Sequence, residues 1–96
     1  SNMEKKNEKE LAKVLSIAGE VLEKEYIANE KAKSVAGSVL VCLGHKGDPS
    51  KKTRETAKQM ITASEKDKKL YREKEIILAR YVLSPKVKIR IISTEK

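Results

Sequence analysis

Apolar side chains recur every three or four residues along the first half of the chain, which is the spacing of one face of an α-helix. They are Leu11, Val14, Leu15, Ala18, Val21 and Leu22, followed by Ala32, Ala36, Val39, Leu40 and Leu43. At 100° per residue both sets fall on one stripe, so the pattern predicts helix over residues 4–44. Glu25 and Asn29 interrupt the stripe. The pattern therefore leaves open one continuous helix or two helices with a break near 25–30.

Residues 39–43 allow a second interpretation. They form a run of β-branched and aliphatic side chains, which is also typical of a buried strand. The helical phase of Ala32, Val35 and Ala36 just before them favours helix.

A loop is predicted over residues 44–50, where Gly44 suits a helix C-cap and Gly47 a turn. Asp48 followed by Pro49 is a helix start signal, and Ser50 is an alternative N-cap. A second long helix should then run over 49–83 and stop before Pro85. Its main apolar stripe consists of Ala57, Met60, Ile61, Ser64, Tyr71, Leu78 and Val82. A narrower second stripe consists of Ala63, Leu70, Ile77 and Tyr81.

The period changes in the last part of the chain. Over 86–93 charged and aliphatic residues alternate, which is typical of a β-strand with Val87, Ile89 and Ile91 on one face. A lone strand leaves its backbone groups unpaired. This C-terminal strand arm must therefore pair with residues 39–43, with a second copy, or with the sheet of another protein.

A mainly α fold follows, an antiparallel helical hairpin of two long helices plus the short C-terminal strand. Because two helices make a thin core, we expect dimerisation to complete a four-helix bundle. Aligning the helices outward from the loop predicts a contact between Glu25 and Lys68 inside the hairpin.

Ninety-six residues suit a single small domain, residues 3–96, with Ser1 and Asn2 interpreted as a scar of expression-tag cleavage. No apolar run approaches the roughly 18 residues of a membrane-spanning helix, so we expect no membrane partner. The single cysteine excludes an internal disulfide framework and suits a reducing compartment, which predicts a cytoplasmic protein.

Charge divides the chain in two. Residues 1–44 hold seven Lys and seven Glu, whereas residues 45–96 hold fifteen Lys and Arg against seven Asp and Glu. The whole excess of +8 therefore lies in the second half, which indicates an anionic partner there.

Several of these basic residues would share one face of the second long helix, within about 80° of one another. They are Lys51, Arg54, Lys58, Lys69, Arg72 and Arg80, and the strand arm adds Lys86, Lys88 and Arg90. A basic line along a rod matches the phosphate backbone of DNA or RNA. With only three Tyr, no Phe and no Trp, we expect backbone contacts rather than base stacking.

The residues that could carry catalysis are few. His45 is the single histidine, and Cys42 lies in an apolar run, so we expect neither a triad nor an activated nucleophile. These two residues lack the further ligands of a zinc site. The loop at 44–50 lacks the spacing of a phosphate-binding loop. We therefore expect no enzyme, no metal and no cofactor.

Two functional hypotheses result. The first is a non-enzymatic basic helical protein that binds nucleic-acid backbone as a homodimer or acts as an accessory subunit of a larger nucleoprotein complex. The second is a protein–protein adaptor whose C-terminal strand adds to the sheet of a partner.

Overall fold

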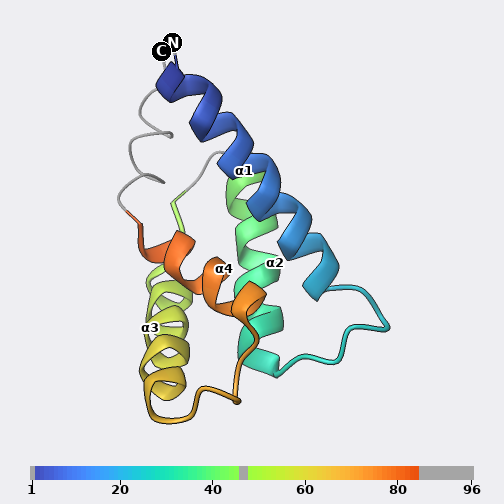
Figure 1. Cartoon of the computed structure of the whole chain (residues 1–96), viewed down its shortest axis with the longest axis vertical. Coiled ribbons are helices and arrows are strands. Elements are labelled where there is room, and N and C mark those ends of the chain that lie inside the picture. The colour runs from blue at the N-terminus through green and yellow to red at the C-terminus, as the bar shows by residue number, and fades with distance from the viewer. Residues whose placement is uncertain (1, 46–47, 85–96) are drawn as a thin grey trace.

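The computed structural model describes residues 2–45 and 48–84, and this part of the chain is entirely α-helical (Figure 1). It forms four helices: α1 (Asn2–Val21), α2 (Glu30–His45), α3 (Lys51–Lys66) and α4 (Glu73–Leu83). None of the described helices combines the length and the apolar content that crossing a membrane requires. The expectation of a mainly helical chain is confirmed, but the arrangement of the helices differs from the predicted hairpin.

The four helices pack as two pairs of consecutive helices, α1 with α2 and α3 with α4. α1 and α2 run antiparallel, whereas α4 lies across α3 (Figure 1). α2 and α4 each pack against all three other helices, whereas the described parts of α1 and α3 do not pack on each other. α2 and α4 are therefore the central elements, and α1 and α3 flank them.

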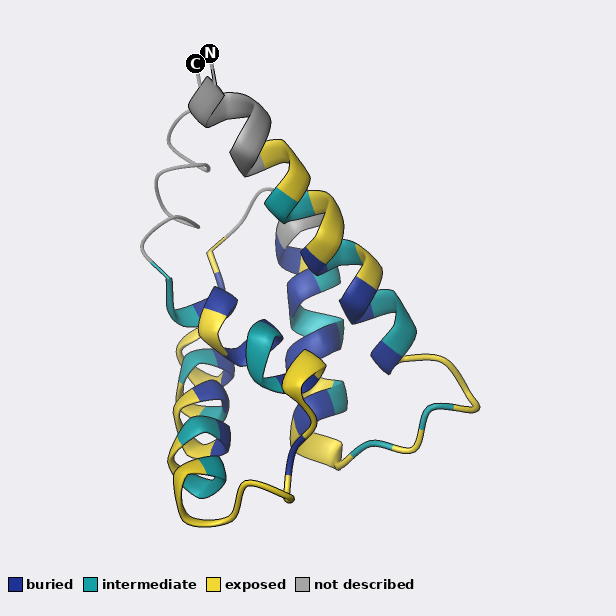
Figure 2. Ribbon diagram, viewed as in Figure 1, coloured by how far each residue is buried: buried dark blue, intermediate teal, exposed yellow. Residues whose placement is uncertain are grey.

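One hydrophobic core lies where the helices meet, and Figure 2 shows the buried positions turned inward on every helix. Small residues let the helices approach closely: Ala18, Ala32, Ala36, Ala57 and Ala79 are fully buried. The largest fully buried side chains are Met60, Leu78, Val21 and Val35, which come from all four helices. A single chain thus covers its own apolar faces.

The first half of the chain is two helices with a break at residues 22–29, the second of the two alternatives that the pattern allowed. α2 begins after Asn29, whose side-chain Oδ1 accepts a 2.7 Å hydrogen bond from the backbone N–H of Lys31. Lys33 closes the break from the other side, because its Nζ donates to the carbonyl oxygens of Val21 (3.2 Å) and Tyr26 (3.1 Å). Residues 39–43 lie within α2, so helix rather than strand is confirmed there.

The prediction of a second long helix over 49–83 is wrong. The chain leaves the helix at Asp67 and re-enters it at Glu73, so that α4 folds back on α3. Asp67 accepts the backbone N–H of Lys69 (3.0 Å), and Tyr71 turns into the core. Folding back buries apolar positions that a straight rod would leave exposed, among them Ala79 and Tyr81.

Three further predictions depended on the straight helix and are also wrong. The hairpin of two long helices and its completion by dimerisation into a bundle are wrong, because four helices close the core within one chain. The Glu25–Lys68 contact is also wrong: both residues lie exposed in the connections between helices, and the register that it required is absent.

At the second helix start the alternative cap is the one formed. Ser50 is the N-cap of α3, so Asp48 and Pro49 precede the helix, and Gly44 lies inside α2 rather than at a C-cap. The predicted strand arm at 86–93 lies outside the described residues. Its pairing with residues 39–43 is excluded, because that segment is helical.

Candidate functional site

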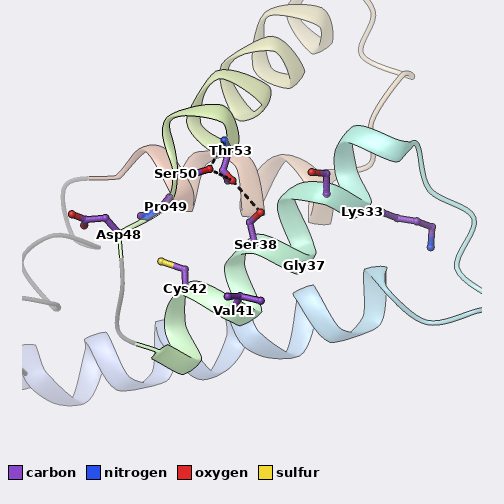
Figure 3. A pocket seen from close by; sticks show the side chains of 10 residues that line it. Lys33, Gly37, Ser38, Val41, Cys42, Asp48, Pro49, Ser50 and Thr53 are labelled. Atoms are coloured by element: carbon purple, nitrogen blue, oxygen red, sulfur yellow. Dashed lines mark hydrogen bonds between the residues drawn. The ribbon is translucent and has the colours of Figure 1, made fainter.

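The first turn of α3 is fixed to α2 by a chain of three hydroxyl groups (Figure 3). Thr53, which is buried, donates from Oγ1 to Oγ of Ser38 at 3.0 Å. Ser50 Oγ accepts the backbone N–H of Thr53 at 3.1 Å and lies 2.9 Å from Thr53 Oγ1. Since the one hydroxyl proton of Thr53 goes to Ser38, Ser50 donates in the second contact. The N-terminus of α3 is thereby held in one position.

Positive charge gathers at this helix start. Lys51, Lys52 and Lys58 are exposed and Arg54 is half-buried, and these four residues are called here the α3 basic surface. The first turn of α3 contains no acidic residue, and Glu55 is the one carboxylate among residues 50–58. The positive end of the helix dipole adds to the same field.

Within the described residues, none of the four side chains of the α3 basic surface forms an ion pair with a carboxylate. Lys51 and Lys58 are seven residues apart on one face, which places them about 10 Å apart along the helix axis. The surface is therefore a short basic line with its charges unneutralised by the part of the protein that is described.

A groove of about 570 Å³ lies beside this surface, between α2 and the start of α3. Its apolar lining comes from Gly37, Val41, Cys42 and Pro49, and Val41 is 62% exposed at its edge (Figure 3). Burial, and then the nearby charge of Asp48, raise the pKa of the Cys42 thiol. The burial of Cys42 agrees with the packing position that its apolar run predicted.

The remaining predicted basic residues do not join the α3 basic surface. Lys69 and Arg72 lie in the connection at 67–72, and Arg80 lies on α4. Only Lys51, Arg54 and Lys58 of the predicted set share one helix, because the straight rod that would have aligned all six is broken. Lys86, Lys88 and Arg90, like Val87, Ile89 and Ile91, lie outside the described residues.

Arg72 has a structural role instead. Its guanidinium lies over the ring of Tyr26, 4.6 Å from the ring centroid. Tyr26 Oη donates a 2.7 Å hydrogen bond to Oε2 of Glu75, a carboxylate that is only 3% exposed. Burial, and then the carboxylate of Glu75, raise the pKa of Tyr26. This cluster joins the connection after α1 to the start of α4, and Arg72 contributes to it by packing on the ring of Tyr26.

Lys52 belongs to the α3 basic surface although it was not among the residues predicted for the basic face. Its side chain lies about 100° from Lys51 around the helix, outside the predicted basic face. The signal that could have found it is the alternative cap at Ser50, which places both lysines in the first helical turn.

Metal-binding groups are not assembled in the described part of the chain: His, Cys, Asp and Glu do not gather there in threes. Nor does the chain match a family model, a curated protein or a solved structure. Function is therefore inferred from the surface itself, and its most distinctive element is the α3 basic surface.

Proposed function

We propose that the protein is a non-enzymatic nucleic-acid-binding protein that contacts the phosphate backbone of DNA or RNA through the α3 basic surface. One observation carries the proposal: Lys51, Lys52, Arg54 and Lys58 gather at the start of a helix, and Glu55 is the one carboxylate among residues 50–58. Acting as an accessory subunit of a larger nucleoprotein complex, in the cytoplasm, suits the same surface and the single reduced cysteine.

The dimensions support backbone contacts. A nucleic-acid strand presents one phosphate about every 3.4 Å along the duplex axis, so the 10 Å between Lys51 and Lys58 spans about three phosphates. Lysine is a point charge that tolerates a range of phosphate positions, whereas a half-buried arginine such as Arg54 is more restricted in direction. Binding of this kind releases counterions and weakens steeply as salt is added.

Base recognition has little support among the described residues. Tyr71 and Tyr81 are buried in the core, and the ring of Tyr26 is covered by Arg72. Without an exposed aromatic platform, we expect similar affinity for duplexes of different sequence.

The test is fluorescence anisotropy of a labelled mixed-sequence DNA duplex and of the matching RNA duplex, from about 50 to about 200 mM salt. Changing Lys51, Lys52 and Lys58 together to Gln should weaken binding at least about tenfold. The slope of the logarithm of the binding constant against the logarithm of the salt concentration should become shallower by about 2 to 3. The matched control changes the exposed Lys9, Lys24 and Lys31 to Gln. Both variants lose three charges, which takes the net charge from +8 to +5.

We expect the control to bind within about threefold of the unchanged protein, because its lysines lie on the electrically balanced helix pair. Equal weakening by both variants would show that only net charge matters and would contradict a defined surface. Lack of binding to either duplex at the lowest salt would reject the proposal.

A further inference from the structure

The outer face of α4 carries a short, ordered pattern of charges. Glu73, Ile77 and Arg80 follow one another at four and three residues, so they lie on one line along the helix with Ile77 near its middle. Glu73 and Arg80 are exposed, and Ile77 is half-buried. Within the described residues, neither Glu73 nor Arg80 forms an ion pair.

A groove runs along each side of this line. The groove toward α1, about 300 Å³, is lined by Ile77 and Arg80 together with Glu10 and Lys13. The groove toward α3, about 460 Å³, is lined by Ile77, Arg80 and Glu73 together with Glu65 and Lys68. α4 is therefore a ridge between two hollows, with a branched aliphatic side chain at its centre.

We propose that this face binds the same face of a second copy, with the two α4 helices antiparallel about a twofold axis at Ile77. In that arrangement Glu73 of each copy lies opposite Arg80 of the other, so the ion pair forms twice, and the two Ile77 side chains meet on the axis. A twofold interface requires a surface that is complementary to itself, and a line that reads acidic, aliphatic, basic has this property in the antiparallel direction.

Charge selects a second copy as the occupant. Among the described residues, the charged side chains of the ridge and its two grooves are three acidic, Glu10, Glu65 and Glu73, and three basic, Lys13, Lys68 and Arg80, which sum to zero. The chain as a whole carries +8, so two copies repel each other when charged faces meet. A face with balanced charge avoids this repulsion, whereas a polyanion would gain little from it.

The contact does not complete the fold, because the core is already closed within one chain, and it does not depend on nucleic-acid binding. With one short helix as its centre, it belongs to the small, weak class of interfaces. We expect the average mass measured by sedimentation equilibrium to rise from 10.8 kDa toward two chains between about 10 μM and about 1 mM.

Charge reversal tests the pairing directly. Glu73→Arg places a second positive charge opposite Arg80 and should keep the protein at the mass of one chain throughout that range. Arg80→Glu should do the same by placing two negative charges together. The double variant Glu73→Arg with Arg80→Glu reverses both partners, keeps the net charge of +8, and should regain the mass increase.

Glu55→Arg is the matched control, since it adds the same charge on an exposed position of α3 and should leave the mass increase intact. Circular dichroism of every variant checks that the helices are retained. The proposal is overturned by an unchanged protein that keeps the mass of one chain at about 1 mM, by a folded double variant that stays at one chain, or by equal dissociation of Glu55→Arg and Glu73→Arg.

Discussion

The two helix pairs share an architecture and differ in their charge. Each pair consists of two consecutive helices joined by a short connection, residues 22–29 in the first pair and 67–72 in the second. Residues 1–44 have no net charge, whereas the segment from α3 through α4 carries ten basic against five acidic residues. Because both pairs contribute to one core, the charge is not required for folding. The difference therefore separates a pair that serves mainly as support from a pair that also presents a surface.

The connections differ in how they are held. Lys33 fixes the first connection from within its own pair, through two backbone carbonyls. The second connection is held by burial of Tyr71 and by Glu75, whose carboxylate accepts the backbone N–H of Arg72 at 3.3 Å. Tyr26 then joins the first connection to the second pair through Glu75. The two helix pairs are thus linked by a hydrogen bond although they differ in net charge.

The largest expected effect comes from Leu78→Ala, in the fully buried part of α4, one of the two helices that pack against all the others. We expect the free energy of unfolding to fall by about 2–5 kcal/mol because a cavity is left in a core that both pairs share. Urea denaturation followed by circular dichroism should still show a single transition. As a control, Val41→Ala at an exposed position should change stability by less than about 0.5 kcal/mol. Two separate transitions would mean that the pairs fold independently.

Tyr26→Phe removes the bridge between the pairs and leaves Glu75 buried without the phenol that donates to it. We expect a loss of about 1–3 kcal/mol, since an uncompensated buried acceptor costs its desolvation free energy. Tyr71→Phe is the matched control, because Tyr71 is buried but is not the donor to Glu75. A double-mutant cycle with Glu75→Gln measures the coupling free energy between Tyr26 and Glu75, which we expect to differ from zero. A value of zero would mean that the bridge contributes nothing to stability.

Lys33→Met tests the first connection alone. It keeps the aliphatic stem and removes the ammonium that donates to Val21 and Tyr26, so we expect a loss of about 1 kcal/mol. Hydrogen exchange should accelerate in residues 22–29 and stay unchanged in residues 67–72. Lys31→Met, two residues earlier and exposed, serves as the comparison and should leave both segments unaffected.

The smallest effect is a dependence on alkaline pH. Burial is the first cause that raises the pKa of both Tyr26 and Tyr71 above 10.0; the second is the hydrogen bond to Glu75 for Tyr26 and the charge of Glu75 for Tyr71. The folded chain therefore holds these protons more tightly than the unfolded chain. The resulting stability is complete below the unfolded pKa of about 10 and is lost as pH rises through the higher folded values. Urea midpoints from pH 9 upward should fall, and fall less in Tyr26→Phe; equal slopes would contradict a role for Tyr26.

Much of the core could be predicted from the sequence. The periodic positions Val14, Ala18, Val39, Met60 and Leu78 are all buried, because helical spacing depends only on local geometry. Of the local signals around residues 44–50, the alternative N-cap at Ser50 is the one that marks the helix start correctly.

The break at 67–72 could not be predicted in the same way. That segment contains neither Gly nor Pro, so no strong breaker marks it. The sign of the break was the splitting of the apolar pattern into two stripes about 100° apart, which one straight helix cannot bury on one side. Glu75 was beyond prediction, because its burial depends on Tyr26, 49 residues away. The basic face was predicted only in part for the same reason. The alignment of its α3 residues depends on helical spacing alone, whereas the positions of Arg72 and Arg80 depend on the turn at 67–72.

The position of α4 also has a consequence for biosynthesis. This helix packs against α1, α2 and α3, and it is the last of the four to leave the ribosome. The apolar faces of the three earlier helices stay partly uncovered until α4 emerges, since each of them contributes to a core that α4 closes. A nascent chain halted before residue 73 would therefore expose these faces to chaperones or to aggregation, and the completed chain would not.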